Sequence, residues 1–337
     1  MYLDMSGSMH NYMYETVEQT LLLVHFARQI GVPFRVYGFS DRIGYRFKGS
    51  DDYKGQFEAN EIFFDERIRL LELFSEKMSK TEMVLMSKAM LCSYITRKKI
   101  NSLLDFVPYE TLRDSYRATV DLFQLGGTPL DAAIVIGINA AKEFRQENRI
   151  DILNTIFLTD GASHDMYYMK KSEDGENYSD HLNSITWGSR DIYVTVSYGN
   201  KTYRPTKITR NLNWTETLYR IYADETGSTN IGYRIIPNNS RYLQSEYQRA
   251  IANFGYLPEL EDLIKKYRKE GYISTTEAEG IDEQFFISIK SLTILDSKMD
   301  KVEAGDSKGR IRSAFKNSMS GSKRSRKMLL DVVERVA

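Results

Sequence analysis

Oxygen-bearing side chains gather close to the N-terminus, where Asp4, Ser6 and Ser8 stand at alternate positions. Carboxylate and hydroxyl oxygens are hard donors, and they suit a small divalent cation. Gly7 lies between the two serines and lets the backbone turn sharply, so that both hydroxyls can point the same way. The pattern alone is weak evidence, because residue frequencies produce it by chance in roughly one chain of this size in ten.

Two later stretches offer further oxygen donors. Residues 125–130 read Leu-Gly-Gly-Thr-Pro-Leu and place the Thr128 hydroxyl at the start of a helix. Taken alone, this stretch predicts only a capped helix, with Thr128 as the cap and Pro129 in the first helical position. Residues 156–161 place Asp160 at the end of an apolar run, and in open α/β sheets ligands bind at that end of the strands. If the three stretches met, their hydroxyls and carboxylates would give a site made only of oxygen donors.

Apolar periodicity, with Gly and Pro as breakers, predicts the elements that would position these residues. Strands are predicted over 33–39, 43–48, 150–158, 191–198, 231–236 and 285–295. Helices are predicted over 12–30, 66–77, 82–102, 109–123, 128–144 and 214–226, with two more within 242–272. The polar stretch 162–190 is predicted to be a solvated loop, with a lid as the alternative. The order predicts a doubly wound α/β fold with a mainly parallel sheet.

The predicted domain organisation is one α/β domain over residues 1–240 and a helical C-terminal extension over 241–337. The domain is interrupted by a helical insertion over about 66–125, whose Met-rich face is more typical of a packed core layer than of a partner surface. Within the extension, residues 307–328 carry eight basic residues and no acidic one. The default interpretation of this tail is a solvated helix, and the sharper one is binding to nucleic acid or to an acidic partner surface.

The first strand is unusually short. Only Met1, Tyr2 and Leu3 precede Asp4, whereas a buried strand commonly has roughly five or six residues. We expect the first strand to be truncated, with the chain forming the C-terminal part of a longer protein or starting at an internal Met.

Composition narrows the class of protein. The chain has 337 residues, of which 42% are hydrophobic, so it can bury a proper core. Lys plus Arg and Asp plus Glu both number 46, so net charge indicates no particular partner. Cys92 is the only cysteine, which excludes an internal disulfide and favours an intracellular protein. The sequence has no apolar run long enough to span a membrane. The expected location is cytoplasmic.

In order along the chain, the Asp-Ser-Ser, Gly-Thr-Pro and Leu-Thr-Asp-Gly stretches resemble the metal-ion-dependent adhesion site of von Willebrand factor A domains. The resemblance covers about residues 1–240 and implies a Rossmann-like α/β fold. It implies that Ser6, Ser8 and Thr128 bind Mg²⁺ (or Mn²⁺) directly, and that Asp4 and Asp160 act mainly through bound water. Such a site is short of negative charge, so its open position favours a carboxylate supplied by a partner protein.

The inserted helices make the chain look most like the T subunit of cobaltochelatase and the related proteins that work beside MoxR-type AAA+ ATPases. Large tailed bacteriophages carry similar reading frames. The resemblance implies a non-catalytic adaptor that docks onto an AAA+ ATPase in a bacterial or phage-infected cell. Two departures weigh against the chelatase branch: the acidic stretch that commonly precedes the domain is missing, and the Gly-Thr-Pro-Leu loop is closer to adhesion-type sites.

Two other classes of function remain as alternatives. A metal-dependent hydrolase would use the ion to activate water, with His164 or His181 as a base, although both are more typical of surface histidines. Hydrolytic sites usually gather several direct carboxylates, and this one offers two carboxylates and three hydroxyls. A bacteriophage structural or assembly protein would use the domain only as a scaffold, and its metal would be dispensable.

Overall fold

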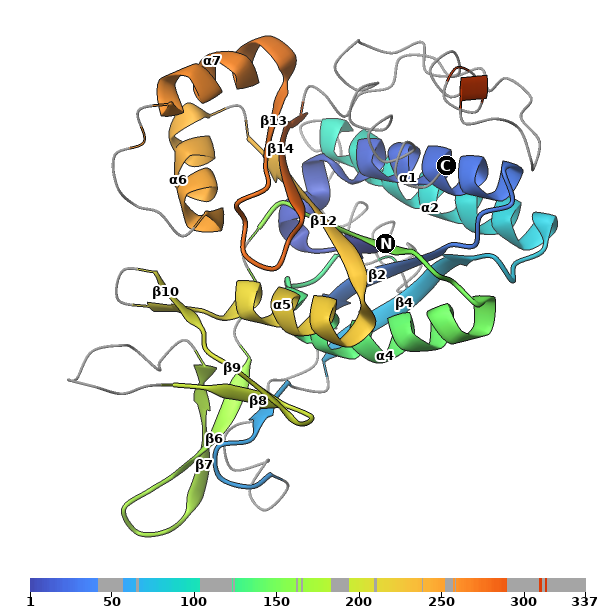
Figure 1. Cartoon of the computed structure of the whole chain (residues 1–337). Coiled ribbons are helices and arrows are strands. Elements are labelled where there is room, and N and C mark those ends of the chain that lie inside the picture. Colours follow the sequence, from blue (N-terminus) through green and yellow to red (C-terminus); the bar gives the residue numbers. More distant parts are fainter. Residues whose placement is uncertain are drawn as a thin grey trace.

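The computed structural model describes residues 1–41, 57–64, 67–103, 123, 125–161, 163–164, 166–182, 194–208, 211–237, 239–251, 257, 259–289, 309–310 and 313. A seven-stranded sheet lies at the centre of this part of the chain, in the order β13-β14-β12-β5-β1-β2-β4 (Figure 1). Its strands are β1 (Tyr2–Asp4), β2 (Arg35–Asp41), β4 (Ile68–Ser75), β5 (Leu153–Thr159), β12 (Ser228–Ile236), β13 (Tyr272–Thr275) and β14 (Glu283–Ser288).

The five inner strands, from β14 to β2, run parallel to their neighbours. The two edge strands run antiparallel, β4 against β2 and β13 against β14. β1 lies inside the sheet, between β5 and β2, and has only three residues. That this strand is truncated stays a prediction. The sheet is therefore mostly parallel, as predicted.

Helices cover both faces of the sheet (Figure 1). On one face α1 (Met13–Gln29) packs beside α2 (Lys80–Leu103), and on the other α4 (Leu130–Asn148) packs beside α5 (Trp214–Thr226). Successive side chains of a strand point to opposite faces. Accordingly, Leu3 belongs to the core under α1, and Tyr2 belongs to the core under α4 and α5. This α/β arrangement is compatible with a doubly wound fold.

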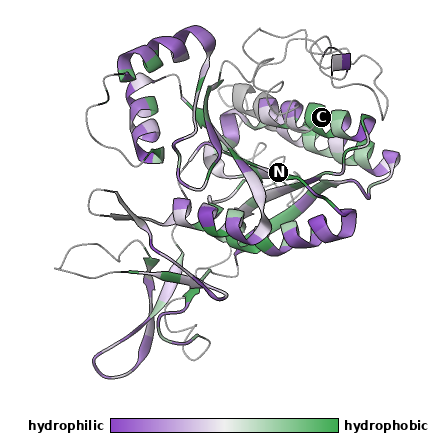
Figure 2. Ribbon diagram, viewed as in Figure 1, coloured by the Kyte–Doolittle hydropathy of each residue, from purple (hydrophilic) through white to green (hydrophobic). Residues whose placement is uncertain are grey.

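The Met-rich face of α2 is part of the core, as expected. Met83, Met90 and Tyr94 are buried in the same cluster as the apolar side of α1. Figure 2 shows the same segregation, with apolar residues along the inner strands and the helix faces turned towards them, and hydrophilic residues over most of α6 and α7. No helix in the described ranges has the length and apolar character needed to cross a bilayer.

Beyond residue 240 the chain is not purely helical. The two helices predicted within 242–272 are present as α6 (Ser240–Ala250) and α7 (Leu260–Glu270). They pack together over a third apolar cluster. The edge strand β13 was not predicted, and it joins β14 in extending the main sheet. The described part of residues 241–337 thus contributes strands to the same sheet, while the proposed division into two domains stays a prediction.

The prediction of a helix over residues 66–77 was wrong. The segment forms β4, which pairs with β2 from Arg35↔Ser75 to Asp41↔Ile68. Its sequence, Ile-Arg-Leu-Leu-Glu-Leu-Phe-Ser, has apolar residues at spacings that satisfy both a helix and a strand. The unpaired edge of β2 decides between them, because it offers the backbone a full set of hydrogen bonds.

The polar stretch 162–190 was wrongly predicted to be a loop throughout. It contains β6 (Tyr167–Lys171) and β7 (Asn177–His181), which form a hairpin that also pairs with β3 (Ile62–Phe63). The turn of the hairpin has Gly175 at a φ of 85°, a conformation that favours glycine. Two short hairpins follow, β8 (Val196–Tyr198) with β9 (Lys201–Tyr203) and β10 (Thr206–Ile208) with β11 (Asn211–Asn213). The described part of the strand predicted over 191–198 contains β8, which pairs with β9 in a separate two-stranded sheet.

Several other predictions fall outside the described residues. These are the edge strand over 43–48, nearly all of the helix over 109–123, most of the strand over 285–295 beyond β14, and most of the basic tail over 307–328.

Candidate metal site

The predicted site lies where β1 and β5 end. These strands are parallel neighbours, with Leu3 beside Leu158, so Asp4 and Thr159 come next to each other at the carboxyl edge of the sheet. The Thr159 hydroxyl donates to Asp4 Oδ2 at 2.6 Å, and the Ser6 amide donates to Asp4 Oδ1 at 2.8 Å. Asp4 is fully buried, and both of its oxygens accept hydrogen bonds.

A chain of hydrogen bonds joins the two serines to Asp160. Ser6 Oγ and Ser8 Oγ are 2.9 Å apart, and Ser8 Oγ donates to Asp160 Oδ1 at 2.7 Å. The serines belong to the turn leading into η1 (Gly7–Asn11), a 3-10 helix. Ser6 and Asp160 are buried whereas Ser8 is exposed, so the group is open to solvent on the side of Ser8. The structure thus brings together four of the five predicted residues.

Thr128, the fifth, joins the group through the backbone of its loop. The Gly7 amide donates to the Gly126 carbonyl at 2.7 Å, and the Gly126 amide donates to the Met5 carbonyl at 3.1 Å. On the other side, the Thr128 carbonyl accepts from the His164 amide at 2.8 Å. All three predicted loops are therefore linked by main-chain hydrogen bonds.

The prediction that Thr128 caps the following helix was wrong. Helix α4 begins at Leu130, directly after Pro129, and the Asp131 amide in its first turn donates to Ser163 Oγ at 2.8 Å. Ser163 comes from the loop that follows Asp160, so a distant residue supplies the cap. The Thr128 hydroxyl is therefore not engaged in capping α4.

Asp41 is a neighbour of the site that the sequence reasoning did not single out. It is the last residue of β2, and its carboxylate accepts a hydrogen bond from the Gly127 amide. A Cβ atom at Gly126 would lie closer than 3.0 Å to the Asp41 carbonyl, so a glycine there allows the loop to approach β2. The same rule that drew attention to Asp160, a carboxylate at the carboxyl end of a parallel strand, would have found Asp41.

Arg234 and Tyr242 support the Asp160 loop from the other side, and neither was predicted. The half-buried Arg234, near the end of β12, donates to the Gly161 carbonyl and pairs with Glu246 on α6, Nε to Oε2, at 3.5 Å. The Tyr242 hydroxyl, also on α6, donates to the Asp160 carbonyl at 3.4 Å. Helix α6 is thereby connected to the backbone that carries Asp160.

Burial makes both carboxylates of the site reluctant to ionise. It raises the pKa of Asp4 to about 6, against the opposing effect of the hydrogen bonds from Thr159 and Ser6. Burial also raises the pKa of Asp160, although the Ser8 hydroxyl and the charge of Arg234 act in the opposite direction. Two buried carboxylates of this kind gain from a nearby cation, which would favour their ionised form.

The donor set of two carboxylates and three hydroxyls fits a small, hard cation. Within the described residues, no three His, Cys, Asp or Glu side chains are grouped so that they could hold a metal. The His164 side chain is exposed and borders Gly127, and the side chain of His181 lies outside the described residues.

Comparison with known proteins adds little to this geometry. No protein-family model matches the chain, and no curated protein matches it. Among solved structures, a crystal structure of the pilus adhesin SpaC from Lactobacillus rhamnosus GG is similar at 13% identity and a TM-score of 0.33. The match covers 77% of this chain and 27% of that chain. A TM-score this low carries no argument about fold or function.

Proposed function

We propose that this chain is a metal-dependent protein-binding domain of the von Willebrand factor A type. Asp4, Ser6, Ser8, Thr128 and Asp160 would hold Mg²⁺ (or Mn²⁺) at the carboxyl edge of the sheet. The observation that carries the proposal is the hydrogen-bonded chain from Ser6 through Ser8 to Asp160, beside the buried Asp4. This chain gathers oxygen donors from the loop after β1 and the loop after β5. Main-chain hydrogen bonds join the loop of Thr128 to both of these loops.

The kind of partner follows from the charge of the donors. If Asp4 and Asp160 act mainly through bound water, as the resemblance implies, the direct ligands are neutral hydroxyls and the cation lacks a directly bound anion. The exposed Ser8 leaves one side of the site accessible, so a carboxylate from another protein can reach it. Binding of such a carboxylate, with an AAA+ ATPase of the MoxR or cobaltochelatase type as the partner, is the function that the resemblance in sequence favours. The same donor set weighs against the hydrolase alternative, which would need more direct carboxylates.

The first experiment measures the metal alone. We expect Mg²⁺ to raise the unfolding midpoint of the wild-type chain at pH 7, because a ligand that binds only the folded state stabilises it, by about 2.7 kcal/mol at 100 times its Kd. Ser8→Ala and Asp160→Asn should abolish most of that rise. Asp151→Asn is the matched control, since Asp151 is an exposed carboxylate at the opposite end of β5. An equal response of all three variants to Mg²⁺ would exclude this site.

The second experiment concerns the partner. We expect wild-type protein to recover an AAA+ ATPase from the source cell in Mg²⁺ but not in chelator, and Asp160→Asn to recover none. Partners that are unchanged by chelator and by the substitution would instead favour the structural role, in which the metal is dispensable.

A further inference from the structure

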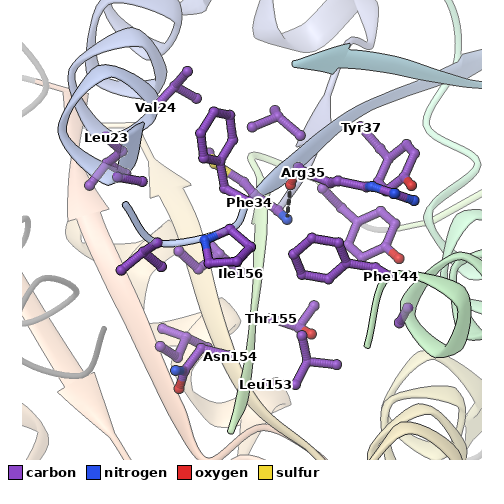
Figure 3. A pocket seen from close by; sticks show the side chains of 18 of the residues that line it. Leu23, Val24, Phe34, Arg35, Tyr37, Phe144, Leu153, Asn154, Thr155 and Ile156 are labelled. Atoms are coloured by element: carbon purple, nitrogen blue, oxygen red, sulfur yellow. Dashed lines mark hydrogen bonds between the residues drawn. The ribbon is translucent and has the colours of Figure 1, made fainter. Parts of the chain in front are cut away.

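Two cavities among the described residues differ in the chemistry of their walls. The larger, of about 140 Å³, borders Met1, and Figure 3 shows mainly apolar side chains around it, among them Leu23, Phe34, Phe144 and Ile156. The smaller, of about 20 Å³, is lined by residues of β5, β12, β14, α5 and α6. Apolar walls offer water few hydrogen bonds, whereas a polar cavity can hold one water molecule once it exceeds roughly 10–15 Å³.

The smaller cavity has a charged wall. Its lining includes three carboxylates and two guanidinium groups, those of Glu216, Glu246, Glu279, Arg234 and Arg249. Glu246 pairs with Arg234 at 3.5 Å and with Arg249 at 3.2 Å. Glu279 Oε1 accepts a hydrogen bond from Arg220 at 2.6 Å. None of these ion pairs involves Glu216, so its carboxyl group differs from the other two.

One oxygen on each of two glutamates has no hydrogen bond within the described part of the protein. These atoms are Glu216 Oε2 and Glu279 Oε2, and both are buried. A buried carboxyl oxygen without a partner is strongly disfavoured, so most such atoms in proteins bond to another protein group or to ordered water. The last torsion of a glutamate side chain is broad, so either oxygen can turn towards the cavity.

Close packing fixes the backbone of both glutamates beside the cavity. Gly280, next to Glu279, has a φ of 72°. A Cβ atom at Gly280 would lie 2.6 Å from the Arg220 amide nitrogen and 2.9 Å from the Glu216 carbonyl oxygen. The loop of Glu279 is therefore packed directly against the backbone of α5, which carries Glu216.

We propose that the smaller cavity is a hydration site, in which one ordered water molecule donates hydrogen bonds to the carboxyl groups of Glu216 and Glu279. Arg234 and Arg249 offer N–H groups from which the same water can accept, so it has the roughly two to four polar partners of an internal water. Burial raises the pKa of Glu216 to about 7. Water suits both forms of this group, because it donates to a carboxylate and accepts from a carboxylic acid.

An ion is a poorer occupant than water. The guanidinium groups of Arg234 and Arg249 would repel a cation, and Glu246 is already shared between them. The three carboxylates of the same wall would repel an anion. A small neutral ligand that both donates and accepts hydrogen bonds is therefore favoured.

The hydration site borders the candidate metal site without sharing its residues. Thr159 lines the cavity, and its hydroxyl donates to Asp4 Oδ2. Arg234 lines the cavity and donates to the Gly161 carbonyl, next to Asp160. The water would thus connect α5 and the loop of Glu279 with the strands that carry the metal site.

The first test is a crystal structure of the wild-type chain in chelator, at a resolution that shows ordered water. We expect one peak in the smaller cavity, at about 2.7–3.0 Å from a carboxyl oxygen of Glu216 and from one of Glu279. Glu216→Gln should keep the peak, because the amide has hydrogen-bonding groups in the same positions. Glu216→Met, with a side chain of similar length, should lose it because the water loses a polar partner.

Water relaxation dispersion, which detects long-lived internal water in solution, gives a second test. Wild type and Glu216→Gln should give equal signals, and Glu216→Met a smaller one. The proposal would be overturned by equal signals from Glu216→Gln and Glu216→Met. It would also be overturned by a wild-type cavity in which both Oε2 atoms bond to protein groups, or by a peak held by several oxygens at about 2.0–2.1 Å, the distance of magnesium. Every measurement is made in chelator, so failure of the candidate metal site changes none of these outcomes.

Discussion

The buried Asp4 carboxylate leads to a prediction about stability in the absence of metal. We expect Asp4→Asn to stabilise the metal-free protein at pH 7, although it removes a residue of the candidate site. The pKa of Asp4 is raised by burial from 3.8 to about 6. At about 1.4 kcal/mol per pKa unit, ionised Asp4 destabilises the folded state by about 3 kcal/mol.

The sign of the pH dependence follows from the direction of this pKa change. Between pH 3.8 and about 6 the folded protein holds the Asp4 proton more tightly than the unfolded chain does. Stability from this group is therefore present at low pH, falls as the pH rises through that range, and levels off above it. Glu216 contributes with the same sign up to about pH 7, because burial raises its pKa to about 7.

Asparagine can keep the hydrogen bonds of Asp4. Its oxygen can accept from the Ser6 amide, as Oδ1 does now at 2.8 Å. Its amide group can donate to Thr159 Oγ1, provided that the threonine hydroxyl turns to the Gly161 carbonyl, which is 3.3 Å away. The substitution thus removes a charge without leaving a buried polar group unpaired.

The assay is chemical unfolding of wild type and Asp4→Asn at pH 5 and pH 7 in chelator. The variant should exceed the wild type by up to about 3 kcal/mol at pH 7 and by about half as much at pH 5. The variant should also lose the Mg²⁺-dependent rise in stability. The reasoning would be refuted by a variant that is less stable than wild type at pH 7 without metal, or whose advantage grows as the pH falls. Asp151→Asn serves as the control, because it removes an exposed carboxylate.

Two further substitutions test how the site loop and the core are held. Gly126→Ala should destabilise by about 1–3 kcal/mol and weaken the response to Mg²⁺, because its Cβ would fall closer than 3.0 Å to the Asp41 carbonyl. Gly161→Ala is its control, since an added Cβ there meets nothing within 4 Å, and both are measured by chemical unfolding with and without Mg²⁺. Tyr222→Phe should cost about 1 kcal/mol in the same unfolding assay, because its hydroxyl lies 3.3 Å from those of Tyr2 and Thr155 in the core. An unchanged unfolding free energy for Tyr222→Phe would mean that these hydroxyl contacts contribute nothing.

Most strands of the parallel sheet and the helices between them could be predicted from the sequence, because apolar residues recur at different spacings in helices and in strands. The helix over 12–30 corresponds to α1, and the strand over 150–158 overlaps β5. β4 was missed because Ile68–Ser75 satisfies both periods, and only its pairing with β2 selects the strand. The β6–β7 hairpin was missed because its residues are mostly polar, so local pattern could not reveal it.

Within the candidate site, the sequence alone indicated those donor residues that lie in short motifs. Asp4, Ser6 and Ser8 come from one turn, and Asp160 follows the strand beside it. The residues that hold the site loops in place come from elements distant in the sequence, and only the fold brings them close to the site. Asp41 reaches the site because β2 neighbours β1, and Arg234 because β12 neighbours β5.

The candidate metal site depends on the three-residue strand β1. Tyr2 and Leu3 anchor β1 to opposite cores, through the Tyr2 hydroxyl donating to the Gly137 carbonyl at 3.0 Å and through the apolar cluster around Leu3. Asp4 then enters the candidate metal site at one end, and Met1 borders an apolar cavity at the other. The neighbours β2 and β5 extend past β1 on the side of Met1, so they fix the strand in register despite its length. A strand this short can therefore place a buried carboxylate accurately, because its position is set by the strands on either side and not by its own length.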